Sequence, residues 1–150
     1  MKKYFIYYSY TGNGDLLAEL LTRSDISLIK VEPKKHMKKV NFFRILRYGG
    51  EAMFKKKMPI QQLDLVLDKE DIVLVGSPIW NDRLSTPILT LLDKYDFNKK
   101  TTKFVFYAGG GKAAHAEKQI VKMGFESKAL VLKQPLSNKE ETEKLLKDFF

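Results

Sequence analysis

The stretch of sequence best suited to chemistry is the loop Ser9-Tyr10-Thr11-Gly12-Asn13-Gly14, which Asp15 and a leucine-rich pattern follow. Small and hydroxylated residues allow backbone N–H groups to close around an anion at a helix N-terminus, and the hydroxyls of Ser9 and Thr11 can donate further hydrogen bonds. The loop holds no lysine, whereas a loop that binds nucleoside triphosphates carries Gly-Lys-Ser/Thr after a longer spacing. The pattern therefore predicts either a phosphate site without triphosphate hydrolysis or an ordinary strand-to-helix turn.

Two later stretches could hold a planar ligand beside that phosphate. Gly76-Ser77-Pro78-Ile79-Trp80-Asn81-Asp82 contains the only tryptophan of the chain, whose flat ring can stack on an aromatic ligand or close the core as a lid. Ala108-Gly109-Gly110-Gly111 contains three successive glycines, which indicate close approach of the backbone, positive φ, or a flexible turn. Together the three stretches are more specific than any one of them.

Short apolar runs predict the strands that position these loops. Residues 4–8, 72–75 and 104–107 are continuously apolar, as in parallel strands that are buried on both faces. Residues 26–31 and 128–132 are interrupted by polar side chains, which is typical of strands at the edge of a sheet. The chain therefore has five expected strands, of which the first, third and fourth precede the three loops.

Helical patterns separate the strands. Their signals are, in chain order, the leucines after Asp15, the cap and proline of Ser85-Thr86-Pro87, residues 112–123 stopped by Gly124, and the capping-box spacing of Ser137 and Glu140. Alternating strands and helices predict one α/β domain over residues 1–150, a three-layer α/β/α sandwich with a parallel sheet of order 2-1-3-4-5. Ligands bind such sheets where the strand order reverses, beyond the carboxyl ends of the strands, so the three loops are expected to meet there.

This combination of loops and elements resembles the short-chain flavodoxins and flavodoxin-like proteins. The resemblance rests on Ser-Tyr-Thr-Gly-Asn at residues 9–13, Gly-Ser-Pro-Ile-Trp at 76–80 and Ala-Gly-Gly-Gly at 108–111, and it covers the whole chain in element order. It implies a flavodoxin-like fold that binds FMN without a covalent bond, with the phosphate in the first loop and the isoalloxazine between the other two. The cofactor-binding residues that it implies are Ser9, Tyr10, Thr11, Gly12, Asn13, Gly14, Pro78, Ile79, Trp80, Asn81, Asp82, Ala108, Gly109, Gly110 and Gly111.

The sequence departs from the family pattern at two places. Gly14 stands where the family usually has serine or threonine, so one phosphate hydrogen bond is expected to be missing, a loss of about 1 kcal/mol and several-fold in affinity. Asn81 and Asp82 stand where many relatives have a glycine whose peptide flips on reduction of the flavin, and asparagine tolerates positive φ better than most residues. Near the flavin, the carboxylate of Asp82 would lower the reduction potential.

The resemblance implies single-electron transfer between partner proteins, with the chemistry supplied by the flavin and no catalytic side chain. An FMN-dependent reductase that uses NAD(P)H, a quinone or a porphyrinogen is the second interpretation, although no segment is dedicated to another substrate. A dinucleotide-binding domain is a third, since Gly12-x-Gly14 begins its fingerprint and Glu32 follows the second strand, but Leu17 replaces its third glycine. A phosphorelay receiver would need acids after the first strand and an aspartate at the end of the third, where Ser9-Tyr10 and Gly76-Ser77 stand.

Composition narrows the remaining function classes. The absence of cysteine excludes disulfides, thiol catalysis and iron–sulfur ligation, and two histidines argue against a histidine-based metal site. The apolar run at residues 4–8 is too short for a signal peptide and lacks a small-residue cleavage site, and no apolar run approaches the length of a membrane span. We therefore expect a cytoplasmic protein with no integral membrane segment.

The net charge of +9 is concentrated in one segment. Residues 34–57 contain nine lysines and arginines and a single acid, Glu51, so the rest of the chain is almost neutral. Phe42, Ile45 and Leu46 have near-helical spacing there, which predicts a basic crossover at about residues 34–58 that packs its apolar side on the sheet. The same pattern would suit an anionic membrane or an acidic protein. We expect redox partners with an acidic docking surface rather than nucleic acid.

Overall fold

The computed structural model describes residues 1–22, 24–35, 57–126 and 128–150. The described elements are, in chain order, β1 (Lys3–Tyr7), α1 (Asn13–Leu21), β2 (Ser27–Lys30), β3 (Ile72–Trp80), β4 (Arg83–Leu84), α4 (Thr86–Lys94), β5 (Thr102–Ala108), α5 (Ala114–Lys122), β6 (Ala129–Lys133), the 3-10 turn η1 (Pro135–Ser137) and α6 (Lys139–Phe149). Each predicted strand is present, with bounds that shift by one or two residues except at the end of β3.

The sheet has the order β2-β1-β3-β5-β6 with all neighbours parallel, which confirms the predicted order 2-1-3-4-5 and the predicted fold class. The sequence did not predict β4, a two-residue strand that pairs antiparallel with the end of β3. The sequence also ended the third strand at residue 75, whereas β3 continues to Trp80. The extension arises because Ser77 and Pro78 still pair with β5, and the next two residues pair with β4.

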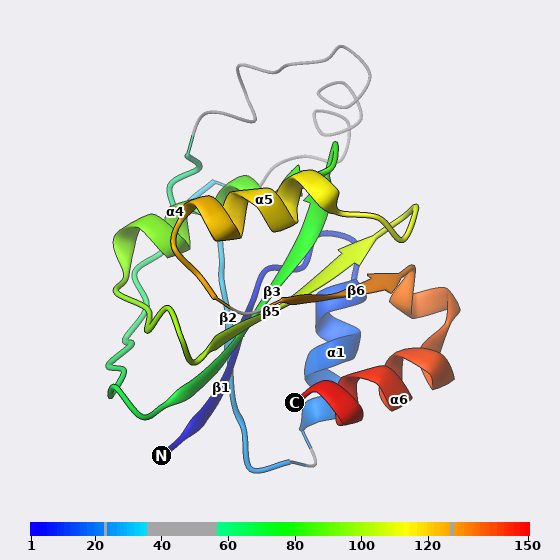
Figure 1. Cartoon of the computed structure of the whole chain (residues 1–150), viewed down its shortest axis with the longest axis horizontal. Coiled ribbons are helices and arrows are strands. Elements are labelled where there is room, and N and C mark those ends of the chain that lie inside the picture. The colour runs from blue at the N-terminus through cyan, green and yellow to red at the C-terminus, as the bar shows by residue number, and fades with distance from the viewer. Residues whose placement is uncertain (23, 36–56, 127) are drawn as a thin grey trace.

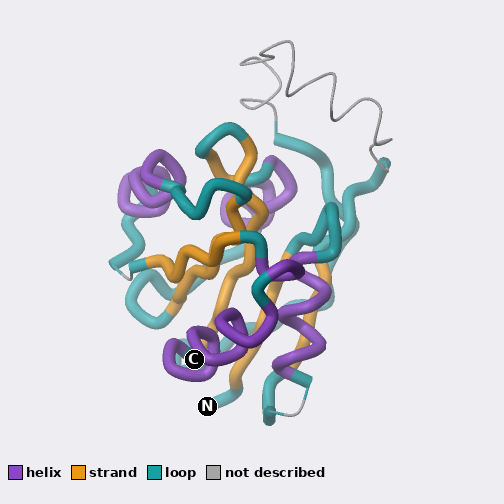
Figure 2. Tube along the Cα trace, turned by 90° about the vertical axis from the view of Figure 1, so that its right-hand side faces the viewer, coloured by secondary structure: helices purple, strands orange, loops and turns teal. Residues whose placement is uncertain are grey.

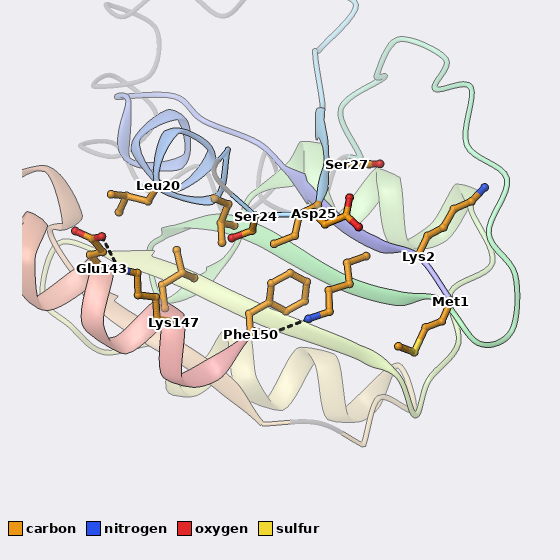
Figure 3. Close-up of a pocket in the computed structure, with 13 residues that line it drawn as sticks. Met1, Lys2, Leu20, Ser24, Asp25, Ser27, Glu143, Lys147 and Phe150 are labelled. Carbon is orange, nitrogen blue, oxygen red and sulfur yellow. Dashed lines mark hydrogen bonds and ion pairs between the residues drawn. The ribbon is translucent and has the colours of Figure 1, made fainter.

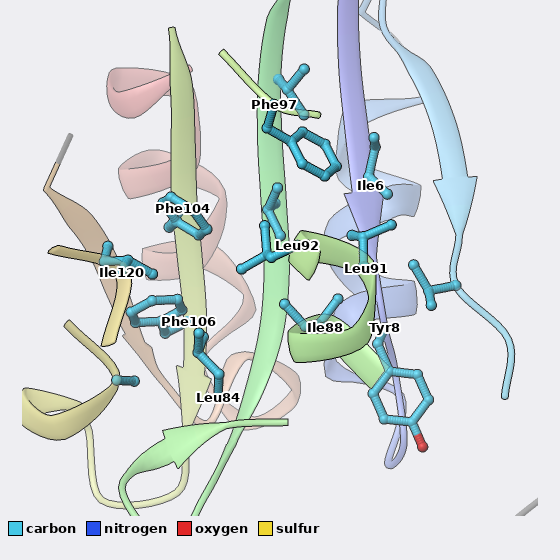
Figure 4. Close-up of a cluster of buried hydrophobic side chains, with 14 of the residues drawn as sticks. Ile6, Tyr8, Leu84, Ile88, Leu91, Leu92, Phe97, Phe104, Phe106 and Ile120 are labelled. Atoms are coloured by element: carbon cyan, nitrogen blue, oxygen red, sulfur yellow. The ribbon is translucent and has the colours of Figure 1, made fainter. Parts of the chain in front are cut away.

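Helices cover both faces of the sheet (Figures 1 and 2). Ile6 of β1 belongs to a buried cluster with Leu91 of α4 and Ile120 of α5, which Figure 4 shows. The adjacent Phe5 points to the other face, into a second cluster that contains residues of α1 and α6. Successive side chains of a strand alternate between faces, so each buried strand needs apolar residues at every position. This requirement explains why the central strands are continuously apolar in the sequence.

Two predicted helix starts differ from the structure in how they are capped. The residue before α6 is Asn138, not Ser137, which ends η1; the Asn138 amide donates to the carbonyl oxygens of Lys133 (3.0 Å) and Gln134 (3.3 Å). The predicted capping box is therefore wrong. Ser85 does precede α4 as predicted, but its buried hydroxyl lies 3.0 Å from that of Ser77 and makes no cap bond.

Most of the basic segment, residues 36–56, lies outside the described residues, and so does its predicted helix. On either side of it the chain is held together by an antiparallel bridge between Pro33 and Ile60. The Lys34 N–H donates to the Pro59 carbonyl at 2.9 Å. Within the described part of the chain, no helix is both long enough and apolar enough to cross a membrane.

Asp71 provides a test of how the start of the sheet is stabilised. Its two carboxylate oxygens accept hydrogen bonds from the backbone N–H groups of Lys2 (2.8 Å) and Asp68 (3.0 Å). The bond from Asp68 and then that from Lys2 lower the pKa of Asp71, so the stabilisation is present above the unfolded-state pKa of about 3.9 and is lost as the pH falls through the lower folded-state pKa. We expect Asp71→Asn to lower the melting temperature at pH 7 and the deficit to shrink toward pH 2.

Circular dichroism at both pH values measures this difference. Asp68→Asn is the matched control, because the Asp68 carboxylate accepts no hydrogen bond from the described residues. An Asp71→Asn deficit that stayed constant between the two pH values would contradict the assigned role of the charge.

Candidate functional site

The first loop turns into α1 at Gly12, whose φ of 99° lies in the left-handed region that favours glycine. Gly12 is the N-cap residue and has no side chain with which to cap the helix. The N–H groups in the first turn of an α-helix have no carbonyl partner within the helix itself. The Ser9 hydroxyl accepts from the Asp15 N–H at 3.2 Å, and the Asn13 amide donates to the Thr11 hydroxyl at 3.4 Å. Two hydroxyls thus lie at the positive end of α1, as the sequence predicts.

The structure gives a reason for glycine at residue 14 that the sequence did not reveal. A Cβ atom at this position would lie 2.7 Å from the Tyr107 hydroxyl and 2.9 Å from the Tyr7 ring. The buried Tyr107 hydroxyl donates to the Tyr8 carbonyl, and burial raises the pKa of Tyr107, which keeps it a donor. A serine or threonine at residue 14 is therefore excluded because the end of β5 packs against the first turn of α1.

The negative charge of Asp15, the acid in the first turn of α1, is compensated by an ion pair. The Lys30 ammonium of β2 lies 2.7 Å from an Asp15 carboxylate oxygen, and the Tyr7 hydroxyl donates to the same oxygen at 3.4 Å. Burial and the nearby Asp15 charge raise the pKa of Tyr7 to about 12. Lys30 therefore offsets the negative charge of Asp15, which would oppose an anion at this helix end, and the same ammonium also lies 4.0 Å from a Glu32 carboxylate oxygen.

The second loop is the tip of the β3–β4 hairpin. Asn81 and Asp82 have φ values of 49° and 61°, as in a two-residue type I′ turn, for which asparagine and aspartate are favoured. The Asp82 carboxylate accepts from the His115 N–H in the first turn of α5 at 3.2 Å, where a negative charge is favourable. The second loop is thereby joined to the helix that follows the third.

Trp80 is buried, with 5% of its surface exposed. Its ring is nearly perpendicular to those of Tyr8 (centroids 5.8 Å apart) and Tyr10 (6.1 Å), so an aromatic contact joins the first and second loops. This burial agrees with the prediction that the indole closes the core at the end of its strand, and stacking of the ring on a ligand stays a prediction. Tyr10 is less buried than Trp80 and packs against the same core cluster.

The structural requirement for glycine differs among the three glycines of the third loop. Gly111 has a φ of 69°, and its N–H donates to the Ala108 carbonyl at 3.2 Å to close a turn. Gly109 and Gly110 do not have positive φ, and a Cβ atom on either would meet nothing within 4 Å. Of the three glycines in this loop, the described residues therefore require only Gly111, whereas Gly109 and Gly110 face open space.

The sequence did not predict a role for the segment after β6. This segment lies at the same edge of the sheet as the three loops, because β6 runs parallel to the other strands. The Gln134 amide donates to the Gly109 carbonyl at 3.0 Å, and the Leu136 N–H donates to the Asn13 side chain at 3.1 Å. This segment thus connects the third loop to the first. The Leu136 side chain is 54% exposed, a large apolar surface beside the helix end.

A cavity of about 480 Å³ lies at the opposite edge of the sheet (Figure 3). It lies beside the starts of β1 and β2 and the ends of α1 and α6, and none of the residues predicted for the cofactor lines it. Glu143 and Lys147 in its wall pair with each other at 2.8 Å. Across the described ranges, no group of three or more potential ligands could hold a metal ion.

Gly14→Ala tests the packing of Tyr107 against the first turn of α1. Overpacking costs about 1–3 kcal/mol, more than the roughly 1 kcal/mol that alanine gains over glycine in a helix, so urea denaturation should show a net loss of stability. Tyr107→Phe removes the oxygen that the new methyl group would meet, so the double variant should lose less than the sum of the two single variants.

Gly109→Ala is the control for Gly14→Ala, because its methyl group enters open space. Its stability should remain close to that of the wild type. Strictly additive losses at residues 14 and 107 would show that the hydroxyl does not determine the glycine.

Comparisons with known proteins bear on the fold. No family model matches the sequence, and no curated protein matches it. A candidate flavoprotein from Bacteroides eggerthii DSM 20697 has a TM-score of 0.75 and 17% identity, and the match covers 99% of this chain and 94% of that one. A flavoprotein from Lactobacillus acidophilus NCFM, crystallised in complex with FMN, has a TM-score of 0.68 and 19% identity, with coverage of 93% and 97%.

A flavodoxin from the domain Archaea is also similar, with a TM-score of 0.54, 17% identity and coverage of 99% and 95%. The match extends over nearly the full length of each chain, while the identities are low. The strand order and the whole-chain superpositions together establish that this chain has the flavodoxin fold.

Proposed function

We propose that this protein binds FMN at the carboxyl edge of its sheet and carries single electrons between partner proteins. The observation that carries the proposal is the open space at Gly109 and Gly110, which the fold itself leaves unexplained. That space belongs to the loop that Gln134 holds and that the 134–136 segment connects to the N-terminal end of α1. The fold is shared with a flavoprotein crystallised in complex with FMN.

The residues at this edge fit the cofactor in their chemistry. Backbone N–H groups of the first turn of α1 and the hydroxyls of Ser9 and Thr11 suit a phosphate, and Lys30 offsets the charge of Asp15. The hairpin tip and the glycine loop suit the edges of a planar ring. The proposed contacts are Ser9, Tyr10, Thr11, Gly12, Asn13, Gly14, Pro78, Ile79, Trp80, Asn81, Asp82, Ala108, Gly109, Gly110 and Gly111.

Bound FMN supplies one-electron chemistry, and the chain supplies binding, orientation and local charge. No side-chain acid, base or nucleophile is required, which agrees with an edge built largely from backbone and small residues. The proposal includes a cytoplasmic location and partner proteins with acidic docking surfaces. Rapid turnover of NADPH or a quinone by the purified protein would favour the alternative, an FMN-dependent reductase.

Gly110→Ala is the sharpest test of FMN binding. Its methyl group meets no protein atom within 4 Å, so the melting temperature should be unchanged, whereas a flavin lying against the loop would lose affinity by about tenfold or more. FMN fluorescence quenching measures the affinity, and flavin absorption released on denaturation measures the cofactor that the purified protein carries.

Gly111→Ala is the matched contrast, because its positive φ and the nearby Lys133 side chain predict a loss of stability. A colourless wild-type protein that FMN fails to titrate would refute the proposal. Equal FMN affinity in the wild type and Gly110→Ala would remove the glycine loop from the site.

Asp82→Asn tests the local charge at the hairpin tip. The amide oxygen of asparagine can still accept from the His115 N–H, so the turn should persist while the negative charge is lost. Spectroelectrochemical titration should give a higher reduction potential for bound FMN, because a nearby anion disfavours the reduced, anionic flavin. An unchanged or lower potential would refute this role for Asp82.

A further inference from the structure

Two neighbouring grooves lie along α5: one of about 450 Å³, which is also lined by residues of α4, and one of about 620 Å³, which is lined by α5, its C-cap residue Met123 and Arg83 of β4. Arg83, Gln119 and Met123 line both of them, so the two are parts of one surface. The larger is here called the α5 groove. Its lining residues are Arg83, His115, Lys118, Gln119, Lys122 and Met123.

The α5 groove is basic, and no ion pair with a described residue neutralises its charges. Lys118 and Lys122 are four residues apart on α5, so they lie on the same side of the helix as neighbours that repel each other. Among the described residues, neither of them nor Arg83 forms an ion pair, whereas Lys57 in the adjoining groove is paired with Asp93 at 2.6 Å. In the parts of the chain that the structure describes, no aspartate or glutamate lines the α5 groove.

One residue that lines the groove, Gln119, is held by a hydrogen bond, and another, Met123, is exposed and flexible. The Gln119 side-chain oxygen accepts from the Leu84 N–H at 2.9 Å, which connects α5 to β4. Met123 is 37% exposed and contributes a flexible apolar side chain, a type enriched at protein interfaces. A hydrogen-bonded glutamine, an exposed methionine and three cations without an ion pair to any described residue together suit a protein surface that carries carboxylates.

The groove begins at the proposed cofactor edge. Arg83 directly follows the hairpin tip, and His115, which also lines the groove, donates its N–H to the Asp82 carboxylate. A protein seated in the groove would therefore touch the loop that flanks the proposed flavin. Lys57, which lines the adjoining groove and pairs with Asp93, is the described end of the segment that holds most of the net charge.

We propose that the α5 groove docks an acidic segment of the redox partner, with Arg83, Lys118 and Lys122 as its cationic contacts. The partner class rests on the proposed electron-transfer function, while the binding of carboxylates by the groove can be measured without it. Arginine forms bidentate bonds with carboxylates, and the two lysines supply point charges on one helix. Association should weaken with salt because the contacts are exposed.

The test uses the full chain and a fluorescein-labelled peptide of ten glutamates, with anisotropy measured at 20 and 300 mM NaCl. The variant Arg83→Gln/Lys118→Gln/Lys122→Gln should bind the peptide about tenfold more weakly at low salt, since each exposed pair contributes modestly. The control Lys69→Gln/Lys128→Gln/Lys144→Gln removes the same charge from exposed lysines that do not line the groove, and should lose threefold or less.

Equal losses in the two triple variants would overturn the proposal, because net charge alone would then explain the binding. The proposal would also be overturned if the groove variant lost binding to phosphatidylserine vesicles or duplex DNA while keeping the peptide. FMN titration of the groove variant separates the two proposals: unchanged FMN affinity with weakened peptide binding supports the groove. Absence of FMN binding in every variant refutes the electron-transfer function and leaves the peptide comparison to decide the groove.

Discussion

The candidate site depends on one buried contact, the hydrogen bond from the Tyr107 hydroxyl to the Tyr8 carbonyl. It connects the ends of two strands that are not neighbours in the sheet, β5 and β1. The hydroxyl also occupies the space where a side chain at residue 14 would stand. The buried Tyr107 hydroxyl therefore determines how far apart the first loop and the glycine loop lie. Its loss would leave the Tyr8 carbonyl without this hydrogen bond.

Charge at the same edge is arranged around helix ends. Asp15, in the first turn of α1, is offset by Lys30, and Asp82 lies at the N-terminal turn of α5. One acid is neutralised where an anion is proposed to bind, and the other remains beside the proposed flavin. Beyond Asp82 the surface becomes basic at Arg83. The charge thus changes sign between Asp82, beside the proposed flavin site, and Arg83, in the proposed docking groove.

The fold could be predicted because its signals are local. Buried parallel strands require continuous apolar runs, and strand order then follows from the handedness of the crossovers. The hairpin β3–β4 was missed because Gly76 to Trp80 combines glycine, serine and proline, which predict a loop, while pairing with β5 and β4 extends the strand. The capping box at Ser137 was wrong because η1 shifts the start of α6 by one residue.

For the candidate site, too, some features could be predicted from the sequence and others depend on tertiary contacts. Residue types and spacing were sufficient to bring three loops to one edge, because every parallel strand delivers its carboxyl end there. The burial of Trp80, the cause of Gly14, the contribution of Gln134 and Leu136, and the basic groove on α5 depend on contacts between residues far apart in the chain. Such contacts leave no periodic or local pattern in a sequence, since packing alone determines which distant side chains meet.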